Sequence, residues 1–461
     1  MKKILLLSFL LVGLYSATAQ NYFMSSPEGF GAAATGGGTP TSSNTVTVTT
    51  YAQLKAALTS TTAATAVILV SGTINCDYTS VLLNNKTIIG LPGARLINLG
   101  LTENIAAKTK PGRWDLSGIL YIKPNSSNVI IRNLTFEGPG AYDVDGRDLI
   151  TNEGTNIWVD HCEFQDGMDG NFDNKGTADN VTISWCKFTY LKPAIPGGFG
   201  GSDNHSYSDL IGSSKDNAPT DGNYSITFKN CYWAEGCKER MPRARNAELH
   251  ILNCYYQTNV ASSLAIGLGG GINNTTCYVE NSDFANVNTI FKSYILKSNG
   301  QEEDGGTVDV KFDNCTKGAT SIPVTNLDLG AATKPSYSYT TLPVGDVAKY
   351  VANSSCGAGA TLQVTAGGIL SAGCPNLGIE NYALNGVRIY PSIVDTTLNI
   401  VFSEVTTEDA TVAIYSTTGS KVLNVTSHDN VSVDVTALAK GLYLCTIKIG
   451  EKSTTLKFIK N

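Results

Sequence analysis

Three arginines lie within six residues in the segment RMPRAR: Arg240, Arg243 and Arg245. The chain as a whole is acidic, with a formal net charge of −6, which argues against a general affinity for nucleic acid. The basic segment is therefore either a solvated loop or a site for a particular anion. Guanidinium groups make planar, two-pronged contacts with carboxylates, so a polymer that bears carboxylates is a candidate ligand.

Two acidic segments precede the arginines. The segment DVDGRDLI contains Asp143, Asp145 and Asp148, and the segment DGNFD contains Asp169 and Asp173. If the two segments lie on adjacent turns of a repeating β fold, about 4.8 Å apart, Asp148 approaches the Asp169/Asp173 pair. Carboxylates this close repel one another, and a cation that prefers oxygen ligands, such as Ca²⁺, relieves the repulsion. The alternative interpretation is that these acids are solvated loop residues.

A repeat in the sequence predicts the elements that position these residues. A small residue recurs in one local context, as in WVDHCEF, TISWCKF and HILNCYY, and Asn often precedes it. The shortest spacing, from Cys231 to Cys254, is 23 residues. Such a repeat with variable insertions is typical of a solenoid, whose units stack because none buries its apolar face alone. The repeated positions are Leu134, Cys162, Cys186, Cys231, Cys254, Ser282 and Cys315.

We therefore predict an all-β fold built on a right-handed parallel β-helix, with the repeated cysteines as an interior column of packed thiols. The Asn residues are expected to form a ladder, each amide bonding to the turns above and below. The segment from Thr50 to Leu58 has helical apolar spacing and is expected to cap the start of the solenoid. The wide gap from Cys186 to Cys231 predicts a long loop, and such loops commonly build the binding face.

The two ends of the chain differ from the repeat. Residues 1–19 contain two lysines, a short apolar run and a small-residue cleavage site, which together indicate a signal peptide. Residues 20–374 are assigned to the β-helix and residues 375–381 to a linker. Alternating strands in residues 382–461 predict a small β-sandwich. Because an exported chain meets oxidising conditions, Cys231–Cys237 and Cys356–Cys374 are candidate disulfides.

The order of the motifs resembles polysaccharide lyase family 1, the pectate lyases. IWVDHCEF, DGNFD, VTISWCKF, DLIGSSK, RMPRAR and LHILNCYY follow one another as they do in that family, and the resemblance spans some three quarters of the chain. It implies a secreted, calcium-dependent enzyme that acts on α-1,4-linked polygalacturonate, the de-esterified form of pectin. The expected reaction is β-elimination, which gives 4,5-unsaturated oligogalacturonides.

Site residues carry over from the family by position. The resemblance implies that Asp148, Asp169 and Asp173 bind Ca²⁺ and that Arg240 is the base that removes the substrate proton. Lys192 and Arg245 match ligands of the substrate carboxylates.

Three further residues of these motifs, Arg243, Asp160 and His161, are interpreted as supports. Two departures from the family pattern matter. The linker after Asp148 is one residue short, so Asp145 could share its role, and an insertion of about a dozen residues follows Lys192.

An arginine base raises an electrostatic requirement. Because a guanidinium is ordinarily protonated, nearby cations (Ca²⁺, Lys192 and Arg245) are expected to lower the pKa of Arg240, and a high-pH optimum follows.

Three other functions account for parts of this pattern. A pectin lyase acts on methyl-esterified pectin without Ca²⁺, and the presence of both Asp169 and Asp173 argues against it. A polygalacturonase, which hydrolyses with two carboxylates, leaves the arginines unexplained. The third is a non-catalytic β-helix adhesin or glycan-binding protein, which would not require Arg240. The four histidines form neither a Ser/His/Asp arrangement nor an HExxH motif.

The C-terminal segment resembles a second family. VRIYPSIVDTTLNI and DVTALAKGLYLCTIKIGEKSTTLKFIK are similar to the sorting domain of the type IX secretion system of Bacteroidetes. This resemblance implies a Gram-negative host, export through that machinery, and a final location at the cell surface or in the medium. An accessory binding module is the alternative. We expect a monomer without a membrane span.

Overall fold

The computed structural model describes residues 22–101, 116–142, 146–196, 202–318, 322–373, 387–402, 409–449 and 452–461. One compact unit runs from Asn21 to Cys374, and the other contains the residues from Pro375 to Asn461. The predicted signal peptide and linker lie outside the described residues, as do Asp143 and Asp145. Within the described ranges, no helix is long and apolar enough to cross a membrane.

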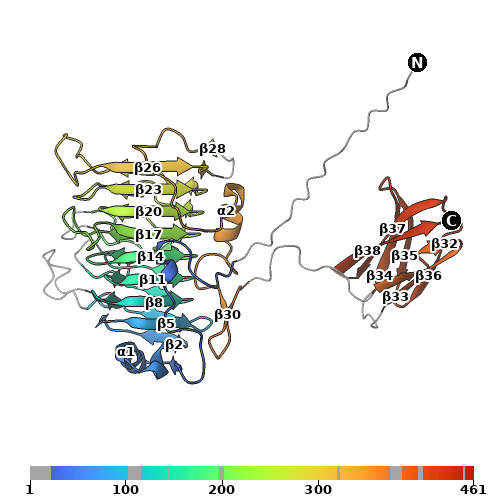
Figure 1. Ribbon diagram of the computed structural model, residues 1–461, viewed down its shortest axis with the longest axis horizontal. Helices are drawn as coiled ribbons and strands as arrows, with labels where there is room; N and C mark the ends of the chain where they lie inside the picture. The colour runs from blue at the N-terminus through green and yellow to red at the C-terminus, as the bar shows by residue number, and fades with distance from the viewer. Residues whose placement is uncertain are drawn as a thin grey trace, which may run out of the picture. The chain divides into compact units, whose positions relative to one another are not determined.

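The first unit is a parallel β-helix, as predicted, and each coil adds one strand to each of three sheets (Figure 1). Sheet A contains β1 (Thr45–Val48), β2 (Val67–Val70), β5 (Asn84–Gly90), β8 (Ser127–Arg132), β11 (Thr155–Asp160), β14 (Asp179–Ser184), β17 (Tyr224–Lys229), β20 (Ala247–Leu252), β23 (Thr275–Glu280) and β26 (Val308–Asp313). These strands are stacked from the blue base to the yellow top of Figure 1.

The other two sheets have the same stacking order. Sheet B contains β3 (Thr73–Asn75), β6 (Arg95–Ile97), β9 (Thr135–Glu137), β12 (Glu163–Gln165), β15 (Lys187–Thr189), β18 (Tyr232–Trp233), β21 (Tyr255–Gln257), β24 (Asp283–Asn286), β27 (Thr316–Lys317) and β28 (Ile322–Pro323). Sheet C contains β4 (Thr79–Val81), β7 (Leu120–Ile122), β10 (Ile150–Asn152), β13 (Phe172–Asn174), β16 (Leu210–Ile211), β19 (Arg243–Ala244), β22 (Leu264–Leu268) and β25 (Thr289–Ser293).

The recurring asparagines have a conformational role at the bend from sheet A to sheet B. Each follows the last residue of a sheet A strand and has a positive φ, which Asn tolerates better than most side chains. The ladder is present in part: Asn253 donates to the carbonyl of Asn281 at 3.1 Å, and Asn314 donates to the Asn281 side chain. The residues at this bend are Asn133, His161, Trp185, Asn230, Asn253, Asn281 and Asn314, with φ between 47° and 58°.

The cysteine column is buried and its thiols are free, as predicted for Cys162, Cys186, Cys231, Cys254 and Cys315. The candidate disulfide Cys231–Cys237 was wrong, because both thiols are free. They donate instead to carbonyls of the neighbouring coil, Cys231 to Ile183 and Cys237 to Phe188, each at 3.3 Å. Cys356 is disulfide-bonded, and its proposed partner Cys374 lies outside the described residues.

The interior also contains a ladder of stacked rings. Neighbouring rings have centroids between 4.4 and 5.4 Å apart and nearly parallel planes, so they bind the coils to one another. The ladder consists of Phe136, Phe164, Phe188, Trp233, Tyr256 and Phe284.

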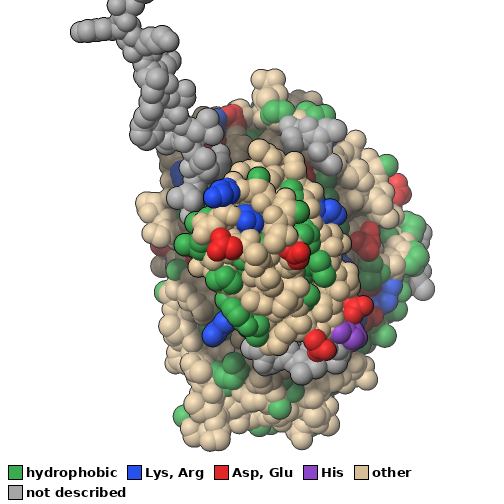
Figure 2. Space-filling view, turned by 90° about the vertical axis from the view of Figure 1, so that its right-hand side faces the viewer, with side chains coloured by type: hydrophobic (Ala, Val, Ile, Leu, Met, Phe, Trp, Pro, Cys, Tyr) green, Lys and Arg blue, Asp and Glu red, His purple; other side chains and the backbone are tan. Residues whose placement is uncertain are grey.

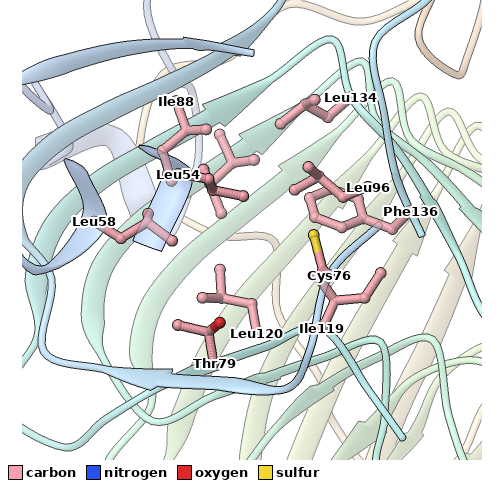
Figure 3. Close-up of a pocket in the computed structure, with 11 residues that line it drawn as sticks. Leu54, Leu58, Cys76, Thr79, Ile88, Leu96, Ile119, Leu120, Leu134 and Phe136 are labelled. Carbon is pink, nitrogen blue, oxygen red and sulfur yellow. The ribbon is translucent and has the colours of Figure 1, made fainter. Parts of the chain in front are cut away.

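A helix caps the first coil, as predicted. Helix α1 (Tyr51–Thr59) follows Thr50, whose hydroxyl accepts from the backbone of Gln53. Leu54 and Leu58 point from α1 toward the first coils and help to enclose an apolar cavity of about 20 Å³ (Figure 3). The remaining short elements are η1 (Phe30–Ala33), η2 (Ala63–Thr65), α2 (Val344–Val351), β29 (Gln363–Val364) and β30 (Leu370–Ser371).

The second unit has two sheets of mainly antiparallel strands that share one apolar core, as expected for a small sandwich. One sheet contains β31 (Val387–Tyr390), β33 (Thr397–Phe402) and β36 (Val431–Asp434). The other contains β32 (Ile393–Val394), β38 (Lys452–Lys460), β37 (Gly441–Ile449), β34 (Ala410–Ser416) and β35 (Lys421–Ser427). On the face of the molecule drawn in Figure 2, charges of both signs are scattered among uncharged side chains.

A buried ion pair links three coils through sheet A. Asp160 accepts from Arg132 and His161, each at 2.9 Å, and from Ser184 at 2.6 Å. Arg132 also donates to the carbonyl of Met24, which ties the N-terminal segment to the coils. Burial alone would raise the pKa of Asp160, but the charges of His161 and Arg132 outweigh burial and lower this pKa to about 2. Asp160 and His161 therefore support the solenoid itself.

We expect Asp160→Asn to lower the free energy of unfolding at pH 7 by about 3–5 kcal/mol, because Arg132 is left buried without its counter-charge. Since the folded-state pKa is depressed, the contribution of Asp160 is present above the unfolded-state pKa of about 4 and is lost toward pH 2. Urea unfolding followed by tryptophan fluorescence measures both effects, because all four tryptophans precede residue 234.

The matched control is Asp77→Asn, which changes an exposed aspartate on an early coil. It should unfold as the parent chain does. Equal losses in the two variants, or an unchanged acid dependence in Asp160→Asn, would contradict a structural ion pair.

Candidate active site

The candidate site lies on the outward face of sheet C, where the register aligns residues from different coils. Asn174, Ile211 and Ala244 pair in succession, so the preceding residues Asp173 and Arg243 lie in one column. Lys175 and Arg245 follow the same two strands and continue the pairing, since Arg245 donates its backbone N–H to Ile211. Parallel stacking therefore brings the acidic segment and the arginine segment onto one surface.

Two of the predicted carboxylates are buried and share a lysine. Asp148 precedes β10 and Asp173 lies in β13, and their side chains are 3% and 0% exposed. The ammonium of Lys175 lies 2.9 Å from Oδ2 of Asp148 and 2.8 Å from Oδ2 of Asp173. Burial and, to a smaller extent, repulsion from Asp148 raise the pKa of Asp173 to about 7. The two acids raise the pKa of Lys175 against the opposing effect of burial, so the lysine is firmly charged.

The third carboxylate, Asp169, lies in the loop between β12 and β13 and is 21% exposed. Its Oδ1 is 2.8 Å from Nε2 of His205 and 4.0 Å from a guanidinium nitrogen of Arg240. Burial would raise the pKa of Asp169, but the hydrogen bond from His205 and the charge of Arg240 hold it well below its usual range. Asp169 therefore carries a negative charge beside Arg240.

The backbone of Arg240 is unusual for a long side chain. Arg240 has a φ of 57°, in the left-handed region, which a long side chain rarely adopts. Its carbonyl accepts from the N–H of Asp209 at 2.7 Å, and its guanidinium lies 4.9 Å from the ring centroid of Tyr207. A strained backbone that neighbours hold in place is common at functional sites.

The expected depression of the pKa of Arg240 depends on Ca²⁺ and stays a prediction, and the protein's own carboxylates act in the opposite direction. Burial lowers this pKa, but the charges of Asp169, Asp173 and Asp148 outweigh burial and raise it above its ordinary value. The physical reason is that the groups surrounding the guanidinium are carboxylates. Among the described contacts of Arg240, none is with Lys192 or Arg245.

The other two arginines share one acid. Asp304 accepts from Arg243 and, at 2.8 Å, from Nε of Arg245, which also donates to the carbonyl of Gly212 at 2.9 Å. The guanidinium of Arg243 also lies over the ring of Tyr294, 3.6 Å from its centroid. Arg243 is thus held on both sides, consistent with its interpretation as a support.

Lys192 is placed beside sheet B. Its ammonium lies 2.9 Å from Oε1 of Glu137 and 2.6 Å from the carbonyl of Gly138, and it is 35% exposed. None of its described contacts is with the three carboxylates or with Arg240.

The carboxylate oxygens of this site are of a type that binds cations, although they do not converge as the ligands of a bound metal do. In the part of the chain that the structure describes, no three His, Cys, Asp or Glu side chains form a ready metal cluster. Oδ1 of Asp148 is nevertheless buried without a hydrogen-bond donor. A Cβ at Gly170 would stand 2.8 Å from Oδ1 of both Asp148 and Asp173, so the glycine leaves a space between two oxygens. Oxygen donors of this kind are those that Ca²⁺ prefers.

Sequence reasoning missed four residues that contact this site. Lys175 could have been found, because it lies two residues after Asp173 and must share its face of the strand. His205, Tyr207 and Asp304 lie in loops and reach the site only through the folding of those loops, so no local pattern indicates them.

We expect Asp304→Asn to lower the free energy of unfolding of the β-helix by about 3–5 kcal/mol, because it leaves two arginines without their buried counter-charge. Asp328→Asn is the matched control, because Asp328 pairs with Lys311 at a site where both side chains are more than 40% exposed. An exposed pair is worth at most about 1 kcal/mol. Urea midpoints compare the two, and equal losses would show that Asp304 is not a buried anchor.

Comparison with known proteins follows the division into two units. A family model described as pectate lyase matches residues 3–361. A second model, described as a secretion system C-terminal sorting domain, matches residues 388–461 and confirms the resemblance of the C-terminal unit.

The sequence relatives bear matching names. The pectate trisaccharide-lyase of Thermotoga maritima is 29% identical over 216 residues, 45% of this chain and 48% of its own. That of Bacillus licheniformis is 31% identical over 283 residues, 59% and 71% of the two chains, and a probable pectate lyase B of Aspergillus oryzae is 32% identical over 255 residues, 53% and 64%. The chain thus spans about half the length of the Thermotoga relative.

Solved structures share the fold. A pectate lyase from Paenibacillus superposes with a TM-score of 0.54 at 20% identity, over 73% of this chain and 96% of its own. The cedar pollen allergen Jun a 1 gives 0.51 at 17% identity, over 70% and 90%. At such identities the likeness concerns the fold alone, and the family assignment depends on the family model, which matches well over half of the residues. The chain belongs to the pectate lyase family.

Proposed function

We propose that the chain is a secreted, calcium-dependent lyase that cleaves de-esterified polygalacturonate by β-elimination and gives 4,5-unsaturated oligogalacturonides. The observation that carries this proposal is the convergence of Asp148, Asp169 and Asp173 with Arg240 at the outward face of sheet C. The carboxylates are suited to hold a cation, and a guanidinium lies beside them. Together these groups can bind and activate a sugar acid.

Asp148, Asp169 and Asp173 would hold the cation. When bound, Ca²⁺ supplies positive charge that stabilises the negative charge developing on the substrate carboxylate. Arg245 and Lys192 are proposed to contact carboxylates of the polymer. Arg245 continues the column that contains Lys175, and each of the two cations already has an acidic partner, Asp304 for Arg245 and Glu137 for Lys192.

Arg240 is proposed to accept the proton from C5 of the sugar. The electron pair of the C5–H bond forms the C4=C5 double bond, the bond from C4 to the glycosidic oxygen breaks, and that oxygen leaves with the bonding electrons and takes a proton from solvent. No water is consumed. Such a step requires a neutral guanidine, and the charges of Asp169, Asp173 and Asp148 oppose this state. The high-pH optimum expected from the sequence stays a prediction.

Two alternatives differ in what they require. A pectin lyase would need no cation, so the buried oxygen of Asp148 and the space at Gly170 would have no purpose. A glycan-binding β-helix would need no group poised to accept a proton. The C-terminal domain supports export through the type IX machinery, to the cell surface or to the medium.

The test follows the ultraviolet absorbance of the unsaturated product from de-esterified polygalacturonate. Product is expected with added Ca²⁺ and not with excess chelator. Arg240→Ala should lower kcat by about 10²- to 10⁴-fold, the usual contribution of a general base, while the variant still binds the polymer. Arg388→Ala, an exposed arginine of the C-terminal unit, is the control and should keep full activity.

Other results would favour the alternatives. Product that forms equally with chelator indicates a pectin lyase. Polymer binding without product, unchanged in Arg240→Ala, indicates a glycan-binding protein.

A further inference from the structure

Residues 202–209, part of the long loop between β15 and β16, run beside the segment that contains Arg240. Three backbone hydrogen bonds join them: Lys238 N–H to Ser206 at 2.8 Å, Ser208 N–H to Glu239 at 3.0 Å, and Asp209 N–H to Arg240 at 2.7 Å. Residues 206–209 are therefore fixed against the segment that contains Arg240.

Two side chains of this loop reach the charged groups of the site. Nε2 of His205 lies 2.8 Å from Oδ1 of Asp169, and the imidazole is 15% exposed. Its ring contacts that of Tyr207, with centroids 4.2 Å apart. The guanidinium of Arg240 lies over the same Tyr207 ring at 4.9 Å. Asp169, His205, Tyr207 and Arg240 therefore form a series in which each side chain contacts the next.

Tyr207 is itself held from several sides. Its carbonyl accepts from the hydroxyl of Tyr190 at 2.5 Å, and its hydroxyl lies 3.4 Å from that of Ser202. The ammonium of Lys238 lies 5.7 Å from its ring centroid and donates to the carbonyl of Asn204. Because the ring is fixed, it can define where the guanidinium rests.

We propose that His205 and Tyr207 are positioning residues: His205 orients the carboxylate of Asp169 for the cation, and Tyr207 holds the guanidinium of Arg240 beside it. This inference rests on the proposed function. It adds two residues that the repeated motifs do not contain, both in the loop between β15 and β16.

The physical basis for His205 is the geometry of a ligating carboxylate. An N–H donated by Nε2 to Oδ1 fixes the rotation of the Asp169 side chain and leaves Oδ2 available to a cation. Hydrogen-bond partners of this kind typically change metal affinity by about 10- to 100-fold when removed. The basis for Tyr207 is the attraction between a guanidinium and an aromatic face, which restricts the position of Arg240.

The first experiment measures Ca²⁺ binding to the full chain by isothermal titration calorimetry, without substrate. His205→Ala should raise the Kd by about 10- to 100-fold. His205→Gln places an amide N–H at a similar reach and should stay within about threefold of the parent. Asp203→Ala, an exposed residue of the same loop, is the matched control and should not change the Kd. Circular dichroism and the melting temperature confirm that each variant is folded.

An unchanged Kd in His205→Ala would overturn the role of His205. Equal weakening in His205→Ala and His205→Gln would also overturn it, because the hydrogen bond could then not be the cause. Wild-type product formation on the same preparation separates these results from failure of the proposed function. If the wild type forms product only with Ca²⁺ and His205→Ala still binds Ca²⁺ normally, only the inference fails.

The second experiment tests Tyr207 by its effects on kcat and on Ca²⁺ affinity. Tyr207→Ala should lower kcat at least tenfold and leave the Kd for Ca²⁺ within about threefold, because it frees Arg240 and not Asp169. Tyr207→Phe keeps the ring and should keep kcat. A normal kcat in Tyr207→Ala, or an equal loss in Tyr207→Phe, would overturn the role of the ring.

Discussion

The register of sheet C is the constraint on which the site depends. Hydrogen bonds between parallel strands of successive coils align Asn174 with Ile211 and Ile211 with Ala244, so the preceding residues Asp173 and Arg243 face one surface. A shift of one residue would turn these side chains into the apolar interior. The buried thiols, the stacked rings and the positive-φ asparagines all serve this register, because they fix how each coil lies on the next.

Electrostatics then distinguishes the site from the rest of the surface. Three acids, one lysine and one arginine lie together. His205 and Arg240 lower the pKa of Asp169, whereas burial and Asp148 raise the pKa of Asp173. Lys175 neutralises part of the negative charge of Asp148 and Asp173 through their Oδ2 atoms. Gly170 leaves space beside their Oδ1 atoms. The protein therefore has a group of carboxylates whose negative charge is only partly neutralised, and a guanidinium lies beside them. This arrangement suits a cation and a sugar acid together.

The sequence predicted the solenoid because successive units of a repeat must stack in register, and it predicted the cap at its start from helical apolar spacing. The column of Cys162 and Cys186 and the helix near Tyr51 are direct consequences of residue spacing. The sequence did not predict the site residues His205 and Asp304, which lie in loops. His205 reaches Asp169 across 36 residues, and Asp304 reaches Arg245 across 59, through loops that no periodic pattern describes. The Cys231–Cys237 pairing was wrong because each thiol faces the coil beside it.

The mass of the products formed from de-esterified polygalacturonate tests the central claim most directly, because elimination and hydrolysis differ by one water for each bond cut. Mass spectrometry of the oligosaccharides formed in the presence of Ca²⁺ reads this difference without reference to any variant. The account predicts fragments that carry an unsaturated, water-deficient sugar at the newly formed non-reducing end. Fragments in which every cut has gained a water would contradict a lyase on this face of the β-helix.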